Sequence, residues 1–145
     1  MYRFSKRLAG LARSEQGTSA VEFAIVMPLF LVLVLGIIVY GSYLAVIHGL
    51  QQLAAEAARA SVPGLSDVER SSLAQGYVTS MATAYPLITP SQITINAAPA
   101  PANANVFVVT LNYDASGMFI YALPNLVPLP PPNIVRSAAI QRGGF

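Results

Sequence analysis

The stretch Gly17-Thr18-Ser19-Ala20-Val21-Glu22-Phe23 decides how this 145-residue chain is organised, because it opens the one long apolar run in the sequence. Residues 23–47 are 25 residues without a charged side chain. About 20 apolar residues in a helix are enough to cross a bilayer. The run therefore predicts a transmembrane helix. Glu22 is a carboxylate at its threshold, where a charge is costly unless a partner neutralises it.

The apolar run has three further features that bear on its interpretation. A cleavable secretory signal would have a shorter apolar core, roughly 7–15 residues, followed by a small-residue cleavage site, and no convincing site follows here. Pro28 lies inside the run and predicts a kink, because proline removes one backbone hydrogen bond and clashes with the preceding turn. Tyr40 and Tyr43 fall near the far end, where interfacial aromatic residues are common.

The charge of the chain is concentrated in its first residues. Residues 1–17 carry four basic side chains and one acidic side chain, a net charge of +3, whereas residues 18–145 carry a net charge of −1. Cations just before an apolar span favour retention of that end in the cytoplasm. No basic face follows later in the chain, so we expect no nucleic-acid partner.

The sequence carries no pattern of catalytic or metal-binding chemistry. It has no cysteine, which excludes disulfides and thiolate sites, and a single histidine, His48, expected at the membrane edge. There is no glycine-rich phosphate loop and no nucleophile–base arrangement. Asp114 follows the best strand candidate, where a turn or cap role is expected. We therefore predict no enzyme activity, no metal and no cofactor.

The first helix is expected to continue past the membrane. Residues 48–60 are alanine-rich, contain no proline and place Leu50, Leu53 and Ala57 at helical spacing. Glu56 and Arg59, three residues apart, are expected to pair weakly.

A second helix is predicted over residues 67–84. Ser66 and Glu69 form the pattern of a capping box at its start, and Pro86 and Pro90 follow its end. Its core face is expected to carry residues at four-residue spacing, namely Leu73, Tyr77 and Met81, with Ala74 and Val78 beside them.

Three short strands complete the prediction. Residues 92–96 alternate in polarity, residues 106–113 are β-branched and aromatic, and residues 134–141 form a weaker strand candidate. Residues 99–105 have the composition of a turn and loop. One face of the second strand is expected to carry Phe107, Val109, Leu111 and Tyr113. With no crossover helix, the strands should form an antiparallel meander. We expect an α+β fold, in which a long N-terminal transmembrane helix extends into a small domain with a second helix and about three strands.

Residues 118–132 contain no charge and five prolines. We call this segment the strap. The sequence leaves two interpretations open. In the first, the strap folds back to cap the sheet. In the second, it is an apolar surface that docks a partner or rests on the bilayer. The candidate docking residues are Phe119, Tyr121, Leu126 and Leu129.

The head of the apolar run resembles the processing site of type IV prepilins, and in particular that of the TadE-like family of tight-adherence (Flp-type) pilus systems. The shared features are the basic leader, the junction Gly17-Thr18, the stretch Ala20-Val21-Glu22-Phe23-Ala24, and Pro28-Leu29. The alanine-rich residues 54–59 and the late strands with a proline-rich stretch between them also resemble the family. Thr18 departs from the aromatic residue that many type IV pilins carry there, which argues against a major pilin.

The resemblance implies a function and a set of partners. A prepilin peptidase would cut after Gly17, and Thr18 would become the mature N-terminus. In pilins, the glutamate at this spacing is thought to meet the N-terminal amine of a neighbouring subunit, and here it is Glu22, followed by Phe23 in the packing helix. The implied protein is a minor pilin or pseudopilin whose partners are the peptidase, other pilins, the pilus assembly machinery and the membrane.

The expected organisation has three parts. These are a basic cytoplasmic leader (residues 1–17), a transmembrane helix with its extension (residues 18–62) and a small extracytoplasmic domain (residues 63–145). The chain would cross the inner membrane once, with the domain in the periplasm or outside the cell. The alternative hypothesis is an uncleaved, single-pass membrane-anchored binding module.

Overall fold

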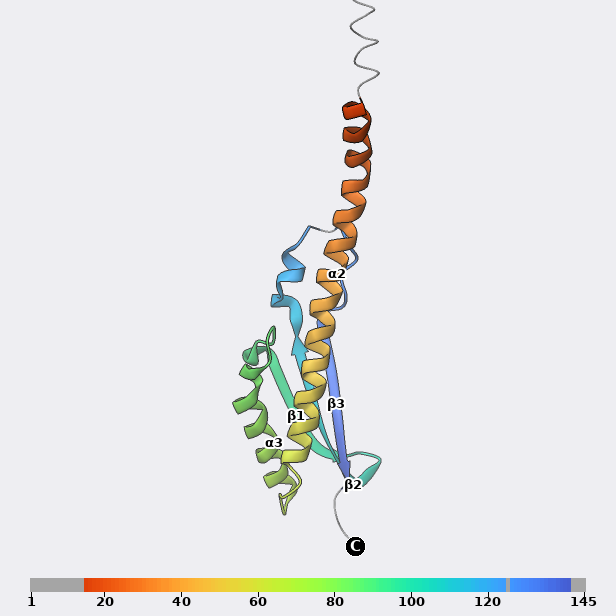
Figure 1. Ribbon diagram of the computed structural model, residues 1–145. Helices are drawn as coiled ribbons and strands as arrows, with labels where there is room; N and C mark the ends of the chain where they lie inside the picture. Colours follow the sequence, from red (N-terminus) through yellow and green to blue (C-terminus); the bar gives the residue numbers. More distant parts are fainter. Residues whose placement is uncertain (1–14, 125, 142–145) are drawn as a thin grey trace, which may run out of the picture. The chain divides into compact units, whose positions relative to one another are not determined.

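The expected α+β fold is confirmed by a computed structural model, which describes residues 15–124 and 126–141. The order of elements runs from a long helix through a shorter helix to a three-stranded sheet (Figure 1). The main elements are α2 (Glu15–Ala60), α3 (Asp67–Met81), β1 (Ile93–Ala100), β2 (Asn103–Asp114) and β3 (Asn133–Gln141). Single 3₁₀ turns join them: η1 (Ala82–Ala84), η2 (Pro90–Gln92), η3 (Ala115–Gly117) and η4 (Phe119–Ala122).

The chain divides into two compact units, Met1–Ile38 and Val39–Phe145, and α2 contributes to both. Within the described part of the first unit, residues 17–38 of α2 expose most of their side chains, including large apolar ones. One helix of the described chain, within Gly17–Ala60, is long and apolar enough to cross a membrane. Exposed apolar surface of this kind suits a lipid environment, so the helix is compatible with a single-pass anchor.

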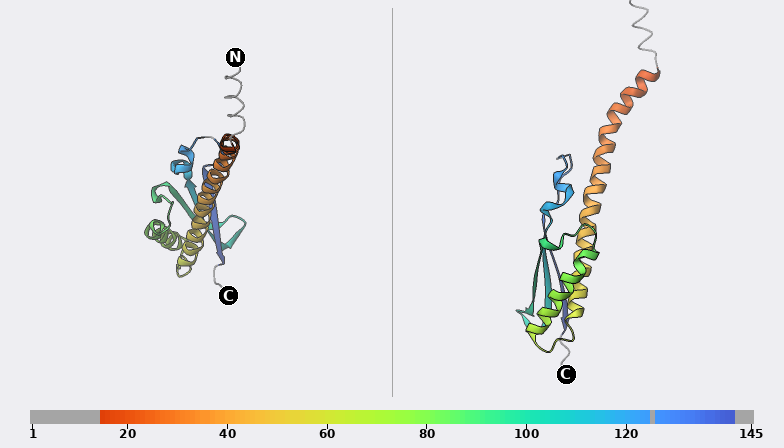
Figure 2. Two further views of the ribbon diagram at one scale, coloured as in Figure 1. Left: turned by 45° about the horizontal axis from the view of Figure 1, so that its top comes forward. Right: turned by 90° about the vertical axis from the view of Figure 1, so that its left-hand side faces the viewer.

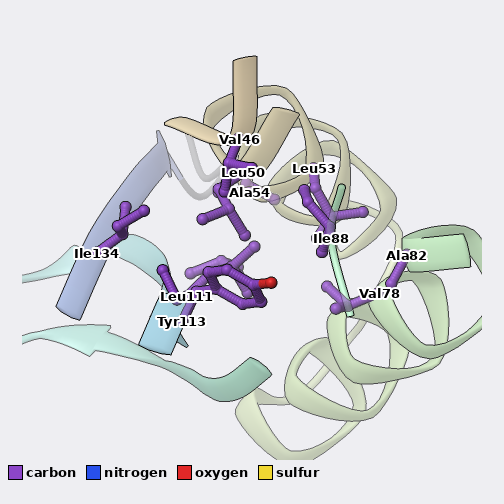
Figure 3. Close-up of a cluster of buried hydrophobic side chains, with 14 of the residues drawn as sticks. Val46, Leu50, Leu53, Ala54, Val78, Ala82, Ile88, Leu111, Tyr113 and Ile134 are labelled. Carbon is purple, nitrogen blue, oxygen red and sulfur yellow. The ribbon is translucent and has the colours of Figure 1, made fainter. Parts of the chain in front are cut away.

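The second unit has two layers, with helices on one face of the sheet. The C-terminal half of α2 runs across that face, and α3 lies beside it next to β1 (Figures 1 and 2). The core lies between the layers, and Figure 3 shows side chains of α2, α3, β2 and β3 converging there. Its members include Val46, Leu50, Leu53 and Ala54 of α2, Val78 of α3, Leu111 and Tyr113 of β2, and Ile134 of β3.

The sheet is the expected antiparallel meander, in the order β1-β2-β3. The predicted inner face of β2 is confirmed, because its alternate residues Phe107, Val109, Leu111 and Tyr113 are buried. Both outer strands receive a hydrogen bond from a helix. Ser71 Oγ donates to the Ala97 carbonyl of β1 at 2.6 Å, and Gln51 Nε2 donates to the Ser137 carbonyl of β3 at 3.1 Å. These bonds tie α3 to β1 and α2 to β3.

The prediction of a turn and loop over residues 99–105 was partly wrong, because the turn there is only two residues long. Pro99 and Ala100 belong to β1, and β2 already begins at Asn103, so only two residues form the turn of this hairpin. Proline lacks the N–H of a sheet ladder, but an edge strand tolerates it. The register shift between Pro99 and Ala100 accommodates the irregularity.

The start of α3 has the predicted serine cap, while the glutamate bond of the capping box is shifted from the N–H of Ser66 to that of Leu65. Ser66 Oγ accepts from the Glu69 N–H at 3.2 Å, and Glu69 Oε2 accepts from the Leu65 N–H at 2.8 Å. The helix itself ends at Met81 and continues as η1 to Ala84, which agrees with the predicted end.

The predicted core face of α3 was partly wrong. Leu73 and Met81 are 38% and 39% exposed, and the buried row is Ala74, Val78 and Ala82. These two rows are neighbours on the helix surface, one residue and hence about 100° apart. The contact with β1, fixed by the Ser71–Ala97 bond, turns the second row inward. The predicted row on α2 is confirmed, since Leu50, Leu53 and Ala57 are fully buried.

Candidate assembly site

The residues of the predicted processing junction lie in the first turns of α2. Gly17, Thr18, Glu22 and Phe23 are all helical and exposed. Thr18 and Glu22 are four residues apart, so they lie one turn apart on the same face of the helix. Within residues 15–124 and 126–141, the only ion pair is Arg59–Glu56, at 2.7 Å. Glu22 therefore presents its carboxylate without a cation from the described chain.

Pro28 lies inside α2, which continues through it. Its ring is exposed, as are most neighbouring apolar side chains in the first unit. The kink that we expect at Pro28 stays a prediction.

The strap residues divide into an inward and an outward set. Ile120 is fully buried, and Tyr121 and Leu129 pack against the core cluster. These side chains cap the end of the core, as the first interpretation of the strap requires. Phe119 and Leu126 are 47% and 55% exposed and leave an apolar surface for a second role.

Three tyrosine hydroxyls hold the strap in place. Tyr40 donates to the Pro128 carbonyl at 2.9 Å, Tyr43 donates to the Pro131 carbonyl at 3.0 Å, and Tyr121 donates to the Pro130 carbonyl at 3.0 Å. A proline-rich segment has few N–H groups of its own, so its carbonyls need donors from elsewhere. Two of these donors come from α2, which ties the strap to a defined level of that helix.

These contacts were missed by sequence reasoning, which assigned Tyr40 and Tyr43 only to the membrane interface. Both bonds join residues 88 positions apart in the chain. A signal was present, because two tyrosines three residues apart share a helix face and the strap offers a run of proline carbonyls.

The Tyr121 hydroxyl should lose its proton at a higher pH than an ordinary tyrosine does. Its pKa is raised above the ordinary value of 10.0 by burial first, and then by Tyr43 and Asp114. The phenolate cannot donate to Pro130, so the stabilisation from this group is present below pH 10.0 and is lost as the pH rises through the higher folded pKa. We expect an ultraviolet titration of tyrosinate to show a late component that the Tyr121→Phe variant lacks. Burial also raises the pKa of Tyr85, so Tyr85→Phe should remove a separate late component.

No arrangement for catalysis stands out in the described chain. Among the described residues, no group of three or more His, Cys, Asp and Glu side chains could hold a metal ion. Asp114 has the expected turn role, because its Oδ1 accepts from the Ser116 N–H at 2.9 Å. That bond lowers the pKa of the Asp114 carboxyl.

Comparison with known families identifies the segment that holds the junction and the span. Residues 17–59 match the family model of TadE-like proteins. The match begins at Gly17, includes Glu22 and the whole apolar run, and ends one residue before α2 does. It confirms the TadE-like resemblance for this segment, which makes up less than half of the chain. No curated protein and no solved structure matches the chain.

Proposed function

We propose that this protein is a minor pilin, or pseudopilin, that takes part in assembling a tight-adherence pilus. The observation that carries the proposal is the TadE-like match, because it starts at the glycine of the predicted processing junction. The exposed apolar helix supports it as well, since a pseudopilin packs such a helix against sister helices. In this proposal the role is structural, and the small domain selects partners.

Processing would complete the assembly site. A prepilin peptidase would cut after Gly17, and the new amine of Thr18 would lie at the start of the helix, four residues before Glu22. An ammonium and a carboxylate attract strongly when both leave water, whereas each alone is costly in a low-dielectric environment. Pairing between Glu22 of one subunit and the amine of a neighbour would therefore favour one register of the packed helices.

The proposed topology follows from the charge pattern. The leader carries four basic side chains, which favours the cytoplasmic side for the N-terminus. The domain would then lie in the periplasm or outside the cell. Its partners would be other pilins and the assembly machinery, reached laterally in the inner membrane.

The processing step can be tested by intact mass. The full chain is expressed with and without an active prepilin peptidase, and the membrane-extracted protein is weighed. We expect residues 1–17 to be lost only when the peptidase is active. The Gly17→Leu variant should keep its full mass, because a side chain there blocks close approach of the backbone to the enzyme. Gly41→Leu is the matched control, since a Cβ at Gly41 would meet nothing within 4 Å.

An uncut wild-type chain in the presence of active peptidase would overturn the processing step. That result would favour the alternative function, an uncleaved membrane-anchored binding module. Cleavage of the Gly17→Leu variant at the same bond would contradict the assignment of Gly17.

A further inference from the structure

The outer end of the membrane crossing can be placed on α2 by two independent markers. The charge-free run begins at Phe23, and about 20 helical residues rise through about 30 Å, which brings the crossing to around residue 42. The last large apolar side chain that α2 exposes is that of Leu44, which is 49% exposed. Beyond it, the bulky apolar residues Val46, Leu50 and Leu53 are buried in the domain core.

The strap is tied to α2 at this same level. Tyr40 and Tyr43 hold the carbonyls of Pro128 and Pro131, and their positions on the helix differ by only about 4.5 Å along its axis. Tyrosines at this depth have the amphipathic character of interfacial residues. Their hydroxyls are engaged by the strap, so a membrane edge at this level of α2 would bring this part of the strap to the headgroups of the outer leaflet.

The chemistry of the strap suits that position. Residues 115–135 contain no charged side chain, so no ion would lose its hydration at a lipid surface. Leu126 is 55% exposed although its neighbours Val127 and Leu129 are partly buried. A bulky apolar side chain held outward at the headgroup level is a feature of interfacial membrane contacts.

We propose that the strap rests on the outer leaflet and that Leu126 enters the boundary between headgroups and acyl chains. The unit that begins at Val39 would then sit directly on the membrane, with its height set by the tyrosine bonds to the strap. This contact does not depend on cleavage after Gly17, so it can fail or succeed separately from the proposed function. A subunit that leaves the bilayer would uncover the strap.

The absence of tryptophan from the sequence allows a direct test. The full-length Leu126→Trp variant is reconstituted in phosphatidylcholine vesicles whose acyl chains are brominated near the headgroup. We expect its fluorescence to fall about twofold relative to unbrominated vesicles, because the quencher acts only at short range within the lipid layer. The matched control is Leu65→Trp, at a leucine that is 94% exposed in the turn after α2. It follows the end of α2, about 30 Å along the helix from Tyr40, and should not be quenched.

A second measurement guards against disturbance by the indole ring. The chain has no cysteine, so a nitroxide can be attached at Leu126→Cys alone. We expect it to collide more with dissolved oxygen than with a water-soluble nickel chelate, and the opposite at Leu65→Cys. Equal quenching of the two tryptophan variants, or a nitroxide at position 126 that favours nickel, would overturn the proposal. Shielding of position 126 only after pilus proteins are added would also overturn it, and would assign the strap to a protein partner.

Discussion

Replacing Phe107 with alanine is expected to lower the free energy of unfolding of the domain by about 3–5 kcal/mol. Phe107 lies on the central strand β2 and is fully buried in the core cluster. Its register partners are Pro99 on β1 and Ile140 on β3, so the strands hold the backbone on both sides. Because the backbone around Phe107 is held in this way, it cannot move far to fill the cavity that the removed ring would leave. The total free energy of unfolding of a small domain is only about 5–15 kcal/mol. The variant should therefore be close to unfolded.

The loss of stability in Phe107→Ala is best measured on the full chain in detergent, by hydrogen exchange of the β2 amides. These amides report on the sheet, whereas the helical signal of α2 would persist in the micelle. Phe119→Ala is the matched control, because it removes the same atoms from a ring that is 47% exposed. Its expected effect is about 1 kcal/mol. Equal losses in the two variants would show that the core does not centre on β2.

Local patterns made the elements of this fold predictable. The alternation along β2 predicted its buried face because neighbouring residues of a strand point to opposite sides. Ser66 and Glu69 predicted the start of α3 because the hydrogen bonds of a capping box span only a few residues. The TadE-like features at residues 17–59 were visible for a similar reason, since all of them lie along one helix.

Features that depend on distant contacts were not predictable in the same way. Leu73 and Ala74 lie in adjacent rows of α3, and only the position of β1 decides which row is buried. Pro99 is typical of a turn, and it fits a strand only because that strand lies at the edge of the sheet. The bond from Tyr40 to Pro128 joins residues 88 positions apart, and the local patterns at its two ends do not show that these residues meet.

The Glu22→Gln variant should still insert in the membrane, while its recovery with pilus partners should fall about tenfold or more, which corresponds to 1.4 kcal/mol. Breaking a buried pair by removing one partner costs about 3–5 kcal/mol, because the other charge stays unpaired. Glu22 lies at the end of the helix, where a charge is partly hydrated, so the cost of breaking its pair should be smaller than this. The measurement is co-purification of pilus partners with the tagged full chain, at equal amounts in the membrane. Glu56→Gln is the matched control, because its pair with Arg59 is exposed and such pairs contribute a few tenths of a kcal/mol.

The partner of Glu22 can be identified by combining this variant with the uncut chain. If the amine of Thr18 is the cation that Glu22 meets, Gly17→Leu already removes the pair, because without cleavage no amine forms at Thr18. Adding Glu22→Gln to Gly17→Leu should then change recovery very little, so the two effects should be strongly non-additive. Two effects that simply add would mean that Glu22 acts through another group. Recovery of Glu22→Gln at the wild-type level would exclude a charge pair at this site altogether.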